Sequence, residues 1–115
     1  MERRYRLSRS RDFDAVYRQG RSVSTRYLTL HWFPREDAPG SPRLGLAVPK
    51  AVGNAVTRNR IKRQLREIWS ELAEDAAQGN DYVLVARAGI TDPTERRGHG
   101  WLSQQVIEVL EKARS

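Results

Sequence analysis

Residues 53–69 read Gly-Asn-Ala-Val-Thr-Arg-Asn-Arg-Ile-Lys-Arg-Gln-Leu-Arg-Glu-Ile-Trp, which is the pattern of an amphipathic helix. The apolar residues of this stretch and its continuation lie within about 40° of one another, at 100° per residue. They are Ile61, Leu65, Ile68 and Leu72. We predict a helix over residues 55–77, with Asn54 as its N-cap and the apolar stripe packed on a β-sheet.

The opposite face of this helix is cationic and spans about 160°. It carries Asn59, Arg60, Lys62, Arg63 and Arg66, with Arg58 at its border. Like charges at i and i+4 repel each other, and cations in the first turns meet the positive end of the helix dipole. A bound polyanion would offset both penalties. We therefore interpret this face as a binding surface for a polyanion, against the alternative of a solvated charged face.

The hydrophobic pattern also predicts the elements around this helix. They are a helix over 11–19, a strand over 23–33, a loop over 34–42, a strand over 44–48, a strand over 81–87, a polar loop over 89–100 with a helical turn after Pro93, and a terminal helix over 101–113. We expect the first two strands to pair as neighbours, and the nearly all-apolar third strand to be central. This order is typical of an α+β protein with helices packed on a sheet.

The chain has 115 residues and a formal net charge of +7. A chain of this length is expected to form one domain, here residues 1–115, with a core but no separate catalytic domain. Because there are no cysteines, disulfide scaffolds, thiol nucleophiles and Cys-based zinc sites are excluded. We find no apolar stretch long enough for a secretion signal or a membrane span, so a cytoplasmic protein without a membrane partner is expected.

The charge is concentrated in the first two-thirds of the chain. Residues 1–35 carry a net charge of +6 and residues 36–66 carry +5, whereas residues 67–115 carry −4. Residues 1–9 are expected to form a flexible basic arm. The cations comprise 18 Arg and three Lys. Arginine binds phosphate through a planar fork and suits RNA, although a high-GC genome would also favour Arg codons.

A catalytic site within the protein is hard to find. His31 and His99 have no near partner for metal binding, and no known hydrolase or phosphate-loop motif is present. Asp92 and Glu95 could hold a metal ion at a spacing of i and i+3, but a solvated loop is the simpler interpretation. We therefore predict no metal site in the protein, and any hydrolysis must use groups outside this chain.

Gly53 to Glu67 resembles the signature of the bacterial ribonuclease P protein subunit, an Arg-Asn-Arg motif followed by x-Lys-Arg-x-x-Arg-Glu. The resemblance extends to Leu44–Lys50, to Asp81–Arg87, and to an N-terminal pattern. That pattern consists of Leu7, Phe13, Val16, Tyr17, Gly20, Arg21 and Ser22. The resemblance as a whole covers roughly residues 5–110, and its central Arg-Asn-Arg motif is specific to the family.

The resemblance implies a two-layer α/β sandwich similar to the second domain of a small-subunit ribosomal protein. The implied order is α-β-β-(β)-α-β-α, with a left-handed crossover. It implies a subunit of an endoribonuclease that removes the 5′ leader from precursor tRNA. In that family the catalyst is the RNA subunit, which holds the Mg²⁺ ions. The implied partners are the catalytic RNA and precursor tRNA, and we expect the protein itself to be a monomer.

Functional residues follow from the resemblance position by position. Those that match the RNA-facing motif are Lys50, Arg58, Asn59, Arg60, Lys62, Arg63 and Arg66. Phe13 and Tyr17 match two helix aromatics that border a cleft for the leader, and His31 occupies a strand position in the same cleft. The family often has Ser-Lys-Lys where this chain has Pro49-Lys50-Ala51, so one cation is missing.

General physical chemistry supports the same two kinds of binding residue, cationic and aromatic. Single-stranded RNA is held by basic grooves and by aromatic side chains on which bases stack. Phe13, Tyr17, Tyr27 and His31 are candidates for such stacking. Phe13 also fits a place in the core, and Tyr17 fits either role. Two other functions stay open: a structural, ribosomal-type RNA-binding protein and, ranked last, an autonomous nuclease that uses Asp92 and Glu95.

Overall fold

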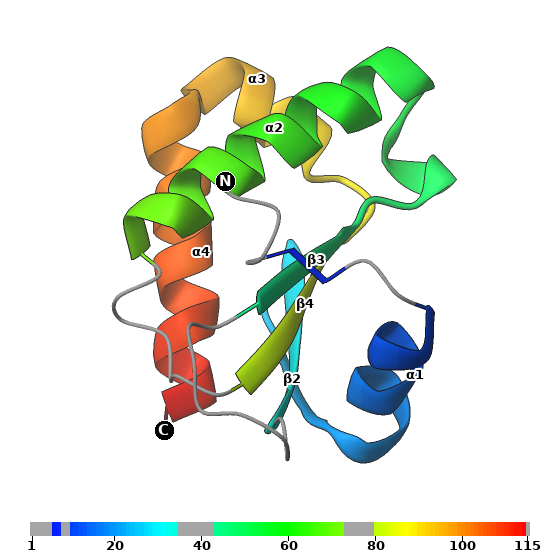
Figure 1. Cartoon of the computed structure of the whole chain (residues 1–115). Coiled ribbons are helices and arrows are strands. Elements are labelled where there is room, and N and C mark those ends of the chain that lie inside the picture. The colour runs from blue at the N-terminus through cyan, green and yellow to red at the C-terminus, as the bar shows by residue number, and fades with distance from the viewer. Residues whose placement is uncertain (1–5, 8–9, 35–42, 73–79, 115) are drawn as a thin grey trace.

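The computed structural model describes residues 6–7, 10–34, 43–72 and 80–114 (Figure 1). Its helices and strands follow one another in a mixed order. They are α1 (Ser10–Gln19), β1 (Arg21–Ser24), β2 (Leu28–Pro34), β3 (Arg43–Ala47), the short 3₁₀ helix η2 (Lys50–Val52), α2 (Ala55–Leu72), β4 (Asn80–Ala86), α3 (Thr91–Arg97) and α4 (His99–Arg114). This confirms the predicted α+β class. The predicted end of the central helix, residues 73–77, lies outside the described residues.

The four strands form one sheet in the order β1-β2-β4-β3. β1 and β4 pair antiparallel with β2, and β3 pairs parallel with β4. The apolar strand β4 is therefore central, as predicted. The prediction that the strands over 23–33 and 44–48 are neighbours is wrong, because β4 lies between β2 and β3. Periodicity within a strand carries no information about which strand is inserted beside it.

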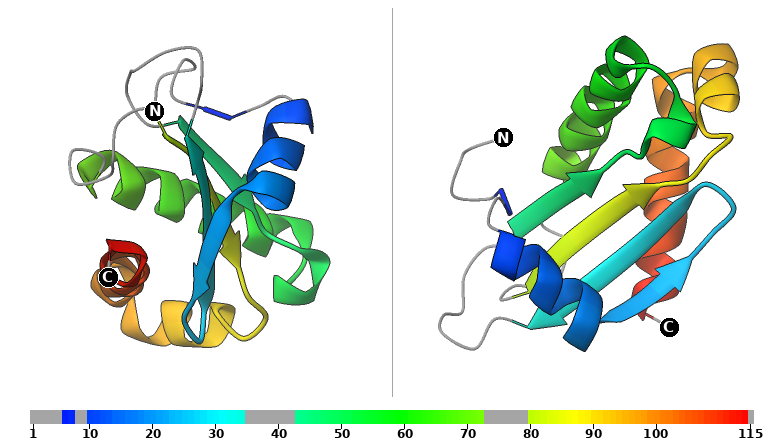
Figure 2. Two further views of the ribbon diagram at one scale, coloured as in Figure 1. Left: turned by 90° about the horizontal axis from the view of Figure 1, so that it is seen from below. Right: turned by 90° about the vertical axis from the view of Figure 1, so that its right-hand side faces the viewer.

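The connection from β3 through α2 to β4 joins two parallel strands. Seen from the side of α1, β3 lies to the left of β4 while both strands point upward, and α2 lies behind the sheet (Figure 2, right). This arrangement is a left-handed crossover, the hand implied by the resemblance and rare among parallel connections. It places α2 on the face of the sheet opposite α1.

Helices cover both faces of the sheet to different extents. α2 and α4 lie on one face, and α1 lies on the other (Figure 2, left). The main core fills the first face and includes Leu65 and Ile68 of α2, Leu84 of β4 and Val106 of α4, all fully buried. A smaller cluster of Leu7, Val16 and Val83 lies under α1. Among the described residues, α1 is the one helix on this second face, and its Tyr17 stays exposed.

Two predicted elements have different boundaries. The strand predicted over 23–33 is divided into β1 and β2 by a tight turn, in which the Thr25 N–H donates to the Leu28 carbonyl at 2.8 Å. Arg26 and Tyr27 lack the usual sequence signature of such a turn. The polar loop predicted over 89–100 is mostly helical. Pro93 is tolerated in the first turn of α3 because its missing N–H has no intrahelical partner there.

The N-terminal arm is not free where the structure describes it. The Leu7 N–H donates to the Leu44 carbonyl at 2.8 Å, and Leu7 is buried beneath α1. Arg6 forms a parallel bridge to Leu44 at the outer edge of β3. These two residues therefore extend the sheet edge rather than belonging to a flexible arm, and the rest of the predicted arm, residues 1–5 and 8–9, lies outside the described residues.

Candidate RNA interface

The start of α2 is fixed by a side-chain cap. Asn54 Oδ1 accepts a hydrogen bond from the Thr57 N–H at 2.9 Å, as predicted for an N-cap. Ile61, Leu65 and Ile68 are buried against the sheet. Because the stripe sets the rotation of the helix, the cationic residues on the other face must point outward or sideways.

The predicted cationic residues fall into two groups around α2. Arg60, Arg63 and Asn59 are exposed, as is Lys50 in η2, whereas Arg58, Lys62 and Arg66 are half-buried along the flanks. Arg60 is engaged by α3, because its Nη1 lies 3.5 Å from Glu95 Oε1 in an exposed ion pair. Arg58 lies at the predicted border of the face, and its Nε is buried without a hydrogen-bond partner among the residues that the structure describes.

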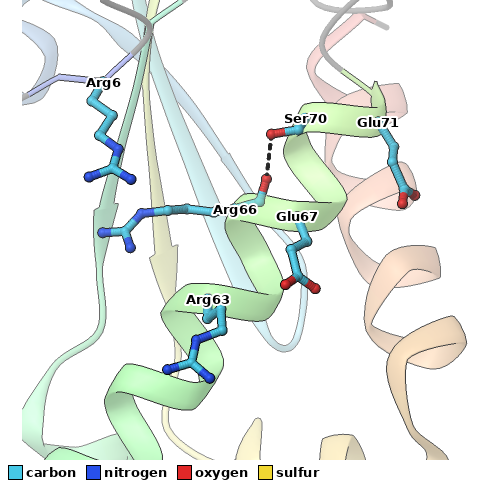
Figure 3. A pocket seen from close by; sticks show the side chains of 6 residues that line it. All are labelled: Arg6, Arg63, Arg66, Glu67, Ser70 and Glu71. Atoms are coloured by element: carbon cyan, nitrogen blue, oxygen red, sulfur yellow. Dashed lines mark hydrogen bonds between the residues drawn. The ribbon is translucent and has the colours of Figure 1, made fainter. Parts of the chain in front are cut away.

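One further cation, which the motif does not contain, joins this surface. Arg6 lines an open depression of about 510 Å³ together with residues of α2, which are Arg63, Arg66, Glu67, Ser70 and Glu71. Figure 3 shows the Arg6 and Arg66 guanidinium groups on one side of α2 and the Glu67 and Glu71 carboxylates on the other. Burial and the positive charge of Arg6 both lower the pKa of Arg66. The sequence offered only the basic composition of the N-terminus as a signal for Arg6.

The three residues predicted for a leader cleft do lie together beside α1. The rings of Phe13 and Tyr17 are 6.5 Å apart, and the Tyr17 ring meets the His31 ring edge-on at 4.9 Å. Tyr17 is 44% exposed, so a flat ligand can reach its ring. Burial raises the pKa of Tyr17 and lowers the pKa of His31. His31 is thus favoured in its neutral form, which can both donate and accept a hydrogen bond.

Phe13 packs on the small cluster under α1, as its alternative place in the core predicts, and its ring also lies near that of Tyr17. Tyr27 does not lie in the cleft. Its ring meets Trp101 of α4 edge-on at 5.0 Å and packs against the main core on the other side of the sheet.

No catalytic centre emerges from the described residues. Within the ranges 6–7, 10–34, 43–72 and 80–114, no three His, Cys, Asp or Glu side chains come close enough to hold a metal ion. Asp92 and Glu95 both lie on α3, and Glu95 pairs with Arg60. The same ranges contain no helix with the length and hydropathy needed to span a membrane. Exposed cations on α2 and the accessible ring of Tyr17 are groups that suit anions and flat rings.

Comparison with known proteins matches this geometry to a family. The sequence profile of ribonuclease P matches residues 1–114. The chain belongs to the ribonuclease P protein family. The ribonuclease P protein component of Geobacillus thermodenitrificans is 35% identical over 113 residues, which cover 98% of this chain and 89% of that protein. The corresponding protein of Bacillus cereus strain B4264 is 37% identical over 94 residues, covering 82% of this chain and 81% of the relative.

Solved structures of ribonuclease P proteins have the same fold. A Staphylococcus aureus RNase P protein superposes with a TM-score of 0.79 at 29% identity, over 95% of this chain and 94% of that one. The Thermotoga maritima protein superposes with a TM-score of 0.82 at 26% identity, over 93% and 96%. The chain is accordingly a protein component of ribonuclease P, an accessory subunit of this endoribonuclease, and it associates with the RNA of that enzyme.

Proposed function

We propose that this subunit binds the catalytic RNA of ribonuclease P with the cationic face of α2, and the 5′ leader of precursor tRNA with the cleft beside α1. The observation that carries the proposal is the separation of the two surfaces. Cations gather on α2 on one side of the sheet, whereas Phe13, Tyr17 and His31 meet on the other side. One monomer in the cytoplasm is sufficient to hold both RNAs at once.

The two surfaces suit different parts of RNA. Exposed guanidinium and ammonium groups neutralise backbone phosphates without reading sequence, which suits a folded catalytic RNA. An exposed tyrosine ring offers a stacking surface to unpaired bases, and a leader is single-stranded. Precursor tRNA carries this leader and mature tRNA does not, so the cleft distinguishes substrate from product.

Magnesium belongs to the RNA in this proposal. The described residues contain no carboxylate cluster that would hold Mg²⁺, and Glu95 is engaged by Arg60. When bound by the catalytic RNA, Mg²⁺ would activate the attacking water and stabilise the leaving oxygen. The contribution of this chain is to bind both RNAs and to reduce the repulsion between them.

Reconstitution tests the proposal. Purified protein alone should not cleave precursor tRNA, and the catalytic RNA alone should cleave poorly at low Mg²⁺. Adding the protein to the RNA should restore cleavage at the 5′ end of the mature tRNA. RNA binding without stimulation would instead indicate a structural RNA-binding protein, and cleavage without RNA, lost in Asp92→Ala, would indicate an autonomous nuclease.

A further inference from the structure

The ring of Phe13 lies on a strand residue that has no side chain. A Cβ atom built on Gly45 of β3 would lie 2.5 Å from Phe13 Cζ and 2.6 Å from Cε1, closer than atoms can approach. Leu7 Cβ would also be close, at 3.2 Å. Gly45 is buried and has no positive φ, so backbone freedom does not explain the glycine. The space above it is occupied by the Phe13 ring.

A second glycine fixes the other end of α1. A Cβ atom on Gly20 would lie against the backbone carbonyls of Trp32 and Val16, and the Gly20 N–H donates to the Val16 carbonyl at 3.1 Å. The end of α1 thus rests on the backbone of β2. Because Val16 is fully buried between these two points, the helix cannot tilt at one end without disturbing its packing.

Resting on the proposed leader cleft, we infer that Gly45 is a positioning residue for leader binding. The Phe13 ring packs directly on the backbone of Gly45, and we call this contact the seat of the ring. The seat fixes the distance of α1 from the sheet, at which the Tyr17 ring lies 4.9 Å from the His31 ring. A methyl group at Gly45 would clash with the Phe13 ring, and the clash can be relieved in two ways. The ring rotates away from β3, or α1 lifts and carries Tyr17 away from His31. Both change the surface on which a base would stack.

The clash need not unfold the protein. The atoms that a methyl group would meet are the far end of the Phe13 side chain, which can rotate. Alanine is also no worse than glycine in a strand interior. A matched control is available in Gly100 of α4, where a Cβ would meet nothing within 4 Å. Gly100→Ala makes the same chemical change in open space.

A double-mutant cycle on the reconstituted holoenzyme tests the inference. The measured quantity is the leader preference, the ratio of the Kd for mature tRNA to the Kd for precursor tRNA. Gly45→Ala should lower this preference by about five- to tenfold, the scale of one displaced stacking platform. Gly100→Ala should leave it unchanged. In a Phe13→Ala background, Gly45→Ala should have no further effect, because the seat is then empty.

Three results would overturn the inference: full leader preference in Gly45→Ala, additive losses in the double variant, or an equal loss of affinity for the catalytic RNA. If Gly45→Ala fails to fold, adding Phe13→Ala must restore folding, and failure to do so also overturns it. If the wild-type holoenzyme binds both tRNAs equally, the proposed leader cleft fails. The contact between Gly45 and Phe13 is then tested by measuring the free energy of unfolding for the same four proteins. Gly45→Ala must again have no effect on this free energy when Phe13 is replaced by alanine.

Discussion

At the scale of single residues, the two exposed arginines of α2 provide an internal comparison. Arg63 has no ion pair among the described residues, whereas Arg60 pairs with Glu95. Arg63→Ala should weaken binding to the catalytic RNA and reduce the log–log salt slope by roughly 0.7–0.9, the value for one lost phosphate contact. Glu95→Gln should strengthen binding, because it releases Arg60. Salt titrations of affinity measure both, and an unchanged slope in Arg63→Ala would show that this side chain touches no phosphate.

His31 should make the free energy of unfolding depend on pH. Burial lowers its pKa below the ordinary value of 6.5, so the unfolded chain binds more protons than the folded protein below that pH. The contribution of neutral His31 is fully present above pH 6.5 and is lost as the pH falls below it. Urea unfolding at about pH 7.5 and about pH 5.5 should show this loss in the wild type and a smaller one in His31→Gln. Equal losses in both proteins would contradict the prediction.

The sequence predicted which side chains of α2 are buried and which point away from the sheet, because helical spacing alone determines which residues share a face. The rotation of α2 follows from Ile61, Leu65 and Ile68, and the cations then follow at 100° per residue. Two contacts of the site could not be predicted from the sequence. Arg6 joins Arg66 only because residues 6 and 7 attach to the edge of β3, and Arg60 meets Glu95 only through the packing of α3. Both are contacts between distant parts of the chain.

At the scale of elements, an ion pair joins β3 to β4 where these strands begin. Arg43 donates from Nε and Nη2 to the two carboxylate oxygens of Asp81, at 2.8 and 2.7 Å, and Asp81 is buried. Asp81→Ala should lower the free energy of unfolding by about 1.5–3 kcal/mol, because charged hydrogen bonds are lost in a partly buried place. Asp12 of α1 lies farther from Arg43, at 3.7 Å. Asp12→Ala should therefore cost less than about 1 kcal/mol.

Chemical denaturation of both variants checks this ranking. A larger loss for Asp12→Ala than for Asp81→Ala would mean that Arg43 serves mainly to hold α1 on the sheet. The measurement has value for the function as well, because α1 carries the proposed leader cleft. A loss of leader preference in Asp12→Ala without a loss of stability would assign Arg43 to the positioning of α1.

The sequence predicted elements better than their arrangement. Local periodicity identified α1, α2, β3, β4 and α4, since each buries one face or both. It failed for the turn at Thr25 and for α3, where the signals are weak: a turn without Gly or Asn, and a proline that fits the first helical turn. The neighbour of each strand depends on the crossover from β3 to β4, which is long-range and of the rarer hand. The left-handed crossover was predicted only from the resemblance to the family.

At the scale of the whole molecule, the strand order connects the two proposed surfaces. Because β4 inserts between β2 and β3, α2 and its cations run along the outer side of the sheet, while α1 spans the opposite face between β2 and β3. The sheet therefore separates the helix that we propose binds phosphates from the aromatic residues that we propose bind the leader. Small size is no obstacle to such a task, since binding two RNAs needs two surfaces but no catalytic cavity.

The net charge of +7 gives a last prediction, because a chain that repels itself is stabilised by any anion that binds only its folded state. Low millimolar phosphate should raise the Tm along a saturating curve. At a phosphate concentration 100-fold above Kd, the free energy of unfolding should rise by about 2.7 kcal/mol. The double variant Arg63→Ala/Arg66→Ala should gain less, since these residues line the depression beside Arg6. Chloride at the same ionic strength is the control, because it screens charge without the bidentate binding that arginine offers to phosphate. An identical, unsaturated rise with both salts would mean that screening alone relieves the repulsion and that no anion site is formed.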